Sequence, residues 1–348
     1  MHIFPLDSEL PVRHLAACFN NTSATYKFYW LLGILDLVAE GNKEMDKKEI
    51  FVRMISNGWY TVNYFHVSFG QQDLIQDTVK ALQITENISI DSPQSSIISK
   101  LLASDNKLTR KLIFHFDKNV PHWFLSPWYP KMDKNDIYLS SQKQAGQPLY
   151  SLYKEHIVVT DDWFAYLQRN IRLIRDFVYW NLSLFLQVRN PNVPDIPGKL
   201  IKPAVRNSLV RQRRFWDYVM EVNGPIRCIY TGKELYKGNY HVEHFIPYSF
   251  VSHDQIWNLI PADNTFNVAK NNKLPQLEQY FSPFYEMQRL ALGTYLKERP
   301  NEKLLQDYFY NGTDLKNGLS KDMFYDVISP LVTIAANNGF EFLRKIEV

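Results

Sequence analysis

The segment from Arg189 to Pro203, RNPNVPDIPGKLIKP, carries four prolines in fifteen residues. Proline lacks a backbone N–H and its ring clashes with the preceding helical turn, so no continuous helix can pass through this segment. We therefore expect a linker here and three regions around it. These are a helical N-terminal domain at residues 1–195, a second domain at 204–280, and a helical C-terminal extension at 281–348 packed on the second domain.

Apolar residues at helical spacing predict several helices. The run from Ser23 to Gly41 is expected to be a buried helix, and QDLIQDTVKALQ (72–83) an amphipathic one. The longest helix is predicted to begin after Thr160, with one side formed by Trp163, Leu167, Ile171, Ile174, Val178 and Leu182. Further helices are expected near 206–222, 286–299 and 321–345, whereas VPHWFLSPWYP (120–130), with three prolines, is expected to be an extended connector.

The two cysteines, Cys18 and Cys228, are far apart and no CxxC pair occurs, which excludes a disulfide scaffold and a zinc ribbon. Any metal must then be held by oxygen and imidazole. The N-terminus MHIFPLDSEL has no secretory pattern, and the apolar run around Asp36 falls short of the ~20 apolar residues that cross a bilayer. We expect a cytoplasmic protein that is not in the membrane.

Positive charge is concentrated in one part of the chain. Between Ile201 and Pro275 there are ten Lys or Arg against six Asp or Glu, while the formal net charge of the whole chain is +3. Such an excess is what contact with a polyanion would favour. Three arginines, Arg211, Arg213 and Arg214, crowd the start of a predicted helix, where a solvated face and phosphate contact are both open interpretations.

The stretch from Arg227 to Pro275 carries the residues suited to chemistry. CIYTG and NYHVEHFIP predict a hairpin around a glycine-containing turn, QIWNLIP a further extended run, and NTFNVAKNN a short helix. Within it lie Glu243, His244, Asn267 and Lys270. Carboxylate and amide oxygens suit Mg²⁺ or Mn²⁺, and imidazole can accept a proton from water near neutral pH. These groups suffice for metal-assisted phosphodiester hydrolysis.

In order and spacing these residues resemble an HNH, or ββα-metal, nuclease domain, and in particular that of RNA-guided CRISPR nucleases. EHFIP, Trp257-Asn258-Leu259 and Asn267-Val268-Ala269-Lys270 follow the family pattern, with offsets of 14 from His244 to Asn258 and 24 from Glu243 to Asn267. The fold class implied is α+β, a mostly helical protein with an embedded ββα-metal domain. The resemblance covers about fifty of the 348 residues.

The resemblance also implies roles. His244 would be the general base, Asn258 a supporting residue that orients it, and Glu243 and Asn267 the ligands of one Mg²⁺ or Mn²⁺ ion. Lys270 would contact phosphate. For Arg211, Arg213 and Arg214 the same role is expected from their charge and position, apart from the resemblance. Two departures are that relatives more often have Asp at position 243, and that many carry CxxC pairs. On a regular strand, moreover, Glu243 and His244 would point to opposite faces.

We therefore expect a DNA endonuclease that nicks as a monomer, in a setting of bacterial anti-phage defence or restriction. The alternative is a DNA-binding or scaffold subunit of a defence complex whose HNH fold no longer cuts. No GxxxxGK[ST] loop occurs, so the chain is not a motor, and an ATPase of the same operon is a possible partner. The N-terminal domain is expected to recognise DNA, dock a partner or regulate cutting. The oligomeric state stays open.

Overall fold

The computed structural model describes residues 4–5, 7, 9–201, 207–309 and 318–344, except for the side chains at 267–269. The chain divides into two compact units, Met1–Pro191 with Ile196–Lys202, and Asn192–Asp195 with Pro203–Val348. Each unit is described by itself below. Among the described residues both units are mostly helical with small sheets, which agrees with the expected α+β class.

The first unit is a helical bundle with one small sheet. Its helices are α1 (Val12–Ala17), α2 (Tyr26–Ala39), α3 (Lys47–Asn63), α4 (Leu74–Thr85), α5 (Gln94–Ala103), α6 (Lys107–Phe114), η1 (His115–Lys118), α7 (Val120–Trp123), α8 (Lys134–Gln142), α9 (Asp161–Arg189) and η2 (Pro197–Lys199). The strands β1 (Glu44–Asp46), β2 (Tyr150–Leu152) and β3 (His156–Val159) form an antiparallel sheet in the order β1-β3-β2.

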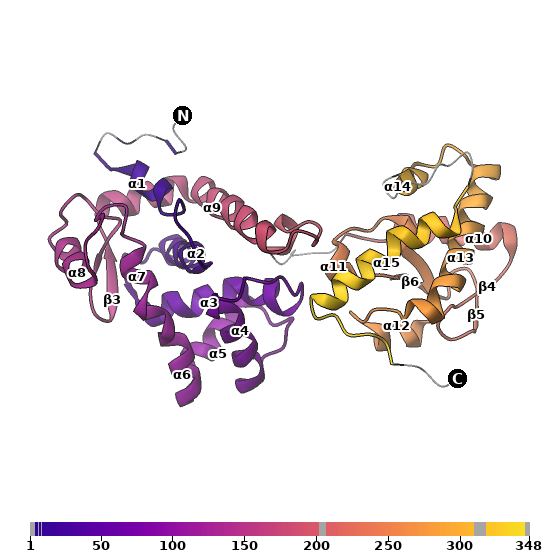
Figure 1. Cartoon of the computed structure of the whole chain (residues 1–348), viewed down its shortest axis with the longest axis horizontal. Helices are drawn as coiled ribbons and strands as arrows, with labels where there is room; N and C mark the ends of the chain where they lie inside the picture. The colour runs from indigo at the N-terminus through magenta and orange to yellow at the C-terminus, as the bar shows by residue number, and fades with distance from the viewer. Residues whose placement is uncertain (1–3, 6, 8, 202–206, 310–317, 345–348) are drawn as a thin grey trace. The chain divides into compact units, whose positions relative to one another are not determined.

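Helix α2 forms the centre of the first unit, with α3 and α9 packed on it (Figure 1). It is apolar on all sides, and its ten buried residues include Phe28, Tyr29 and Trp30. A helix that is hydrophobic all round belongs in a core. The indole N–H of Trp30 donates to the hydroxyl of Tyr150, 3.0 Å away, and that hydroxyl donates to the carbonyl of Pro121 at 2.6 Å. The bonds join α2, the sheet and α7.

The second unit surrounds two short ladders with helices (Figure 1). Its elements are α10 (Val210–Asn223), β4 (Ile226–Arg227), β5 (Glu234–Leu235), β6 (His241–His244), α11 (Tyr248–Val251), η3 (Ile256–Asn258), β7 (Leu259–Ala262), α12 (Asn264–Lys270), α13 (Leu277–Glu298), η4 (Lys303–Leu305), α14 (Gln306–Phe309) and α15 (Lys321–Asn337). Strand β4 pairs with β5, and β6 pairs with β7, both antiparallel.

Helix α13 anchors the β6–β7 ladder. The ring of Phe245, next to His244, stacks on Phe284 with centroids 3.8 Å apart. The buried amide of Gln288 donates to the carbonyl of Leu259 at 2.9 Å, and Trp216 of α10 donates to the same carbonyl at 3.2 Å. Because side chains and backbone are both held, the ends of β6 and β7 are fixed in the core of this unit.

Most predicted helices are confirmed, with shifted ends. The helix predicted from Ser23 begins at Tyr26, and the long helix runs from Asp161 to Arg189 with five of its six predicted apolar residues buried. Helix α13 begins at Leu277, nine residues before the prediction.

Two predictions about local structure are wrong. Residues 120–130 form α7 and successive turns. Pro121 is tolerated because it lies in the first helical turn, where a backbone N–H would have no acceptor within the helix. The hairpin expected between CIYTG and NYHVEHFIP is also absent from the described ladders. Strand β6 pairs instead with β7, and CIYTG forms the turn between β4 and β5.

The proline-rich segment also differs from a simple linker. Residues Ile196–Lys202 belong to the first unit, where the hydroxyl of Thr61 donates to the carbonyl of Lys199 at 2.8 Å. Residues 202–206, at the expected start of the second domain, lie outside the described part. The second unit contains both the segment expected at 204–280 and the C-terminal helices. None of the described helices combines the length and apolar character needed to span a membrane.

Candidate active site

The predicted site residues lie on the β6–β7 ladder and the helix that follows it. In this ladder Glu243 is paired with Ile260 and His244 with Leu259. Helix α12 comes directly after β7 and contacts β6. The ladder and helix thus bring Lys270 to Glu243 and His244, although Lys270 lies 27 residues after Glu243 in the sequence.

Asn258 braces the chain where it leaves β6. Its side-chain oxygen accepts from the backbone N–H of Ile246 at 2.8 Å, and its amide nitrogen donates to the carbonyl of the same residue at 2.8 Å. Its own carbonyl accepts from the N–H of Phe245 at 2.8 Å. Asn258 is fully buried. Its amide has both a donor and an acceptor, so one side chain can pair with the backbone N–H and the carbonyl of Ile246 together. The loop after His244 is therefore fixed.

The imidazole of His244 is held by a carboxylate that the sequence did not indicate. Its Nε2 lies 2.9 Å from Oδ1 of Asp254, and the side chains are 7% and 15% exposed. The ring of Tyr248 packs edge-on against the imidazole at 5.6 Å. A carboxylate hydrogen-bonded to one imidazole nitrogen fixes the ring orientation and leaves the other nitrogen for proton transfer.

Glu243 turns toward α12 rather than toward Asp254. Its Oε1 accepts from the ammonium of Lys270 at 2.9 Å, and the same ammonium donates to the carbonyl of His244 at 2.6 Å. Lys270 is fully buried, and burial lowers its pKa, an effect that the charge of Glu243 opposes. The side chains of Glu243 and His244 thus have different partners, Lys270 and Asp254, as their alternation on a strand would suggest.

Residues 228–276 match an HNH endonuclease family model. The match covers the segment singled out by spacing and supports an HNH family and nuclease character for it. No curated protein and no solved structure matches the chain. We call residues 228–276 the HNH segment.

The HNH segment has the donor chemistry for a hard divalent ion, but the described side chains do not complete a site. Within the described part of the chain, no group of three or more His, Cys, Asp or Glu side chains is arranged to hold a metal. Glu243 offers a carboxylate that is 12% exposed, with Oε1 already bonded to Lys270. Asn267, the second expected ligand, belongs to α12, but its side chain lies outside the described part.

The four expected phosphate contacts occupy different environments. In place of a phosphate contact, Lys270 has a buried ion pair, because its ammonium points into the unit. Arg211 and Arg214 are exposed near the start of α10, whereas Arg213 lies over the ring of Tyr240 at 5.1 Å. The hydroxyl of Tyr240 bonds to Asp217, and this raises its pKa together with burial, the larger cause.

Other residues of the HNH segment have structural surroundings. Cys228 is buried at the start of the β4–β5 turn, and its sulfur accepts from the N–H of Asp263. Trp257 is 3% exposed and donates to Gln255, so its faces are not available to stack on a base in this arrangement. His241 is exposed on β6. The cysteines are both free, in line with the absence of CxxC pairs.

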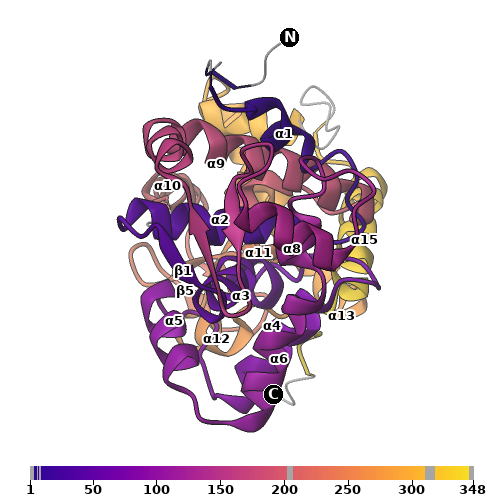
Figure 2. The same cartoon turned by 90° about the vertical axis from the view of Figure 1, so that its left-hand side faces the viewer.

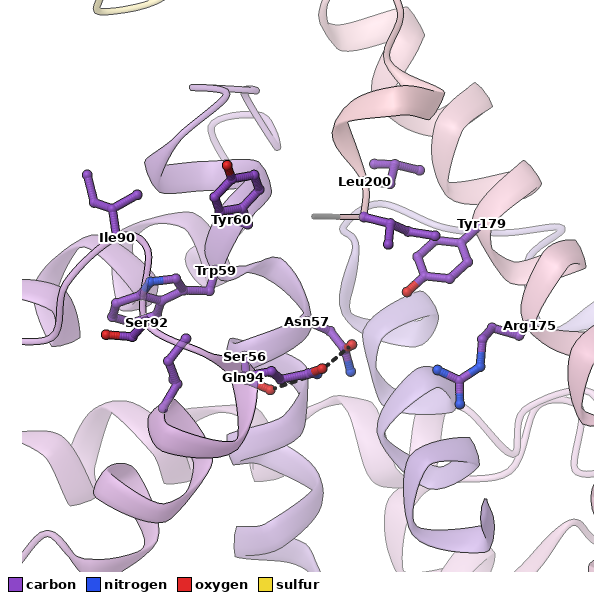
Figure 3. Close-up of a pocket in the computed structure, with 12 residues that line it drawn as sticks. Ser56, Asn57, Trp59, Tyr60, Ile90, Ser92, Gln94, Arg175, Tyr179 and Leu200 are labelled. Atoms are coloured by element: carbon purple, nitrogen blue, oxygen red, sulfur yellow. Dashed lines mark hydrogen bonds between the residues drawn. The ribbon is translucent and has the colours of Figure 1, made fainter. Parts of the chain in front are cut away.

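A pocket of about 270 Å³ in the first unit, lined by both polar and apolar side chains, was not predicted (Figure 3). Several of its polar groups are paired: Gln94 donates to Ser56 and Asn57, and Arg175 pairs at 2.9 Å with Asp36, which lies outside the pocket lining. These contacts engage part of the polar lining within the unit.

Proposed function

We propose that the HNH segment is a divalent-metal-dependent endonuclease that hydrolyses the phosphodiester bonds of DNA. The observation that carries the proposal is the surroundings of His244. Its ring is oriented by Asp254, its backbone carbonyl accepts from Lys270, and the loop after it is braced by Asn258. A buried histidine whose ring is oriented by a carboxylate and whose backbone and following loop are held by Lys270 and Asn258, inside a segment that matches a nuclease family, suits a general base.

In the proposed mechanism His244 removes a proton from the attacking water. When Nε2 donates its hydrogen to Asp254, the neutral tautomer leaves Nδ1 unprotonated and able to accept that proton. The carboxylate of Asp254 then stabilises the imidazolium that forms, and it keeps the ring from rotating. Asp254 therefore acts as a positioning residue for His244. Asn258 supports the same histidine by holding the loop between β6 and α11.

The metal ligands in this proposal are Glu243 and Asn267. Oε1 of Glu243 is bonded to Lys270, so Oε2 is the oxygen left to bind the ion. Asn267 lies in α12, the helix whose Lys270 bonds to Glu243. An Mg²⁺ or Mn²⁺ ion held by these residues would supply Lewis-acid chemistry, polarising the scissile phosphate and stabilising the departing oxygen. Lys270 holds the carboxylate of Glu243 in place through a 2.9 Å ion pair, while Arg211 and Arg214 are exposed for contact with neighbouring phosphates.

One active centre of this kind cuts one strand, so a monomer should nick duplex DNA. We place the activity in bacterial anti-phage defence or restriction, with a partner protein or an ATPase encoded in the same operon as the source of the licensing signal. The clustering of basic residues between Ile201 and Pro275 supports a DNA substrate. Genes for a methyltransferase, an ATPase or a sensor next to this one would support the setting.

A second candidate is a DNA-binding or scaffold subunit that no longer cuts. It is favoured by the ion pair between Glu243 and Lys270, because an ammonium already neutralises the carboxylate expected to bind the metal. In this case the buried pair would serve only to hold α12 on β6.

Supercoiled plasmid distinguishes the two candidates. With Mg²⁺ or Mn²⁺, the endonuclease converts it to the open-circle form, and a chelator or His244→Ala abolishes the conversion. His241→Ala, an exposed histidine on the same strand, is the matched control and should leave the rate unchanged. DNA binding without cutting in either metal would establish the scaffold and exclude the endonuclease.

A further inference from the structure

A basic trough crosses the surface of the first unit beside α6. One depression of about 460 Å³ is lined mainly by charged side chains, and a second of about 300 Å³ adjoins it. The two adjoin at Arg110 and Phe114, which line both, and we call them together the trough. Its cationic lining comes from α3, α6 and the β2–β3 turn and consists of Lys47, Lys48, Lys107, Arg110, Lys111 and Lys154.

The carboxylates in the trough do not balance these cations. Three of them line it, Asp105, Asp117 and Glu155. Asp117 is bonded to the buried ammonium of Lys47 at 2.9 Å, and Glu155 lies 3.6 Å from Lys154. With six cations against three carboxylates, the trough is positive, and the excess is carried by exposed side chains of α6.

Lys47 is the buried, fully hydrogen-bonded cation of the trough. Its side chain is 1% exposed, and its ammonium donates to Asp117, to the hydroxyl of Tyr138 and to the carbonyl of Lys154, each at 2.9 Å. These three acceptors come from different elements, so one buried ammonium fixes the β2–β3 turn next to η1 and α8. The wall opposite α6 is therefore rigid.

Helix α6 presents the accessible cations. Lys107, Arg110 and Lys111 are exposed and lie at spacings of three and four residues, which puts them on one face of the helix. In the described part of the chain, none of the three has a carboxylate within ion-pair distance. The opposite face of α6 is buried through Thr109 and Ile113, so the basic face must point to solvent.

The form of the trough fits a polymer better than a single small anion. Cations spaced along a helix at about 5–6 Å form a row, whereas a site for one anion converges on one point. The row contains point charges and one guanidinium, and no cluster of amide side chains that could discriminate base edges. Such a surface contacts a phosphate backbone without regard to sequence.

We propose that this trough binds the backbone phosphates of the nucleic acid, so that the first unit holds the duplex while the HNH segment acts on it. The identity of that duplex as DNA rests on the proposed function, but the trough's affinity for backbone phosphates does not. Contact with Lys107, Arg110 and Lys111 releases counterions from the duplex, and this makes binding dependent on salt.

The test measures binding of the full chain to two DNA duplexes of unrelated sequence, by fluorescence anisotropy over a range of salt concentrations, with a chelator present to prevent cutting. The variant Lys107→Gln/Arg110→Gln is compared with Arg169→Gln/Arg172→Gln. The control pair has the same spacing and charge change on an exposed face of α9, along the upper edge of the unit in Figure 1, whereas α6 is at its lower edge.

We expect the α6 variant to bind both duplexes about tenfold more weakly near physiological salt, and the slope of log K against log salt to fall by about two. The control variant should behave as the parent does, and both should keep the parent melting temperature. Unchanged binding by the α6 variant, or an equal loss in the control, overturns the proposal.

Two further measurements, with duplex RNA and with inorganic phosphate, test which phosphate-bearing ligand the trough binds. If the α6 variant loses affinity only for duplex RNA, the trough does not hold the DNA substrate. If inorganic phosphate raises the melting temperature of the parent but not of the α6 variant, while DNA binding is unchanged, the trough is a small-anion site. Either result overturns the proposal. Plasmid nicking is scored separately: nicking with no α6 effect on binding refutes only the trough, and an α6 effect without nicking refutes only the endonuclease.

Discussion

Nε2 of His244 lies 2.9 Å from Oδ1 of Asp254, so the candidate base is paired with a carboxylate ten residues further along the chain. This pair carries more of the proposed mechanism than any other contact in the second unit. It fixes both the ring orientation of His244 and the nitrogen that faces away from the carboxylate.

Asp254→Asn should lower the rate of plasmid nicking by about 10–100-fold, because the amide keeps the shape but loses the charge that stabilises the imidazolium. We expect kcat to fall while KM stays within about twofold, since Asp254 does not contact the substrate. The control is Asp326→Asn on an exposed position of α15, which should leave both constants unchanged. A rise in KM of about 10–100-fold with an unchanged kcat would contradict a positioning role.

Lys270→Met should destabilise the second unit by about 3–5 kcal/mol, because it leaves the carboxylate of Glu243 poorly solvated and without its partner. Urea denaturation gives the free energy of unfolding. The double variant Lys270→Met/Glu243→Gln should recover part of the loss, since no unpaired charge remains. If Lys270 instead served mainly to contact phosphate, Lys270→Met would weaken DNA binding and leave the free energy of unfolding unchanged.

Asn258→Ala should cost about 2–3 kcal/mol of stability, because both polar groups of Ile246 lose a buried hydrogen-bond partner. The matched control is Asn239→Ala, at an exposed asparagine in the same unit, for which we expect a change within about 0.5 kcal/mol. Nicking by Asn258→Ala should fall as well, since the loop after His244 is no longer fixed. Full activity with reduced stability would limit Asn258 to a structural role.

The residues of the HNH segment could be found from sequence because their spacing is fixed by short elements. Glu243 and His244 adjoin on one strand, Asn258 directly precedes the partner strand, and Lys270 ends the helix that follows. The long helix α9 was predictable for a related reason. Its apolar residues repeat at helical spacing from Trp163 to Leu186, so periodicity alone reveals it.

The rest depends on contacts that spacing does not encode. Asp254 meets His244 because the chain turns twice between them, through α11 and then through Ser252, which has a φ of 58°. The pairing of β6 with β7 was missed because the glycine-containing turn before β6 is a stronger local hairpin signal than the longer connection after it. The burial of Lys270 was missed because a lysine is usually found at the surface.

His122 predicts how the stability of the first unit depends on pH. Burial, the largest cause, and the nearby charge of Lys134 lower its pKa from 6.5 to about 4. Its Nδ1 is buried, with no hydrogen-bond partner among the described residues, so a second proton would be poorly accommodated. Between pH 6.5 and 4 the unfolded chain takes up a proton that the folded unit does not, so stability should fall as the pH is lowered across this window.

The expected loss is at most about 3.5 kcal/mol, because the pKa falls by about 2.5 and each pKa unit corresponds to about 1.4 kcal/mol. His122→Phe should remove this part of the pH dependence, so the difference in the free energy of unfolding between parent and variant should change steadily from pH 7 to pH 4. Trp123→Phe, at the neighbouring exposed ring, has no titrating group and should keep the parent's slope. If the parent and the His122→Phe variant instead lose the same free energy of unfolding between pH 7 and pH 4, His122 is protonated in the folded unit.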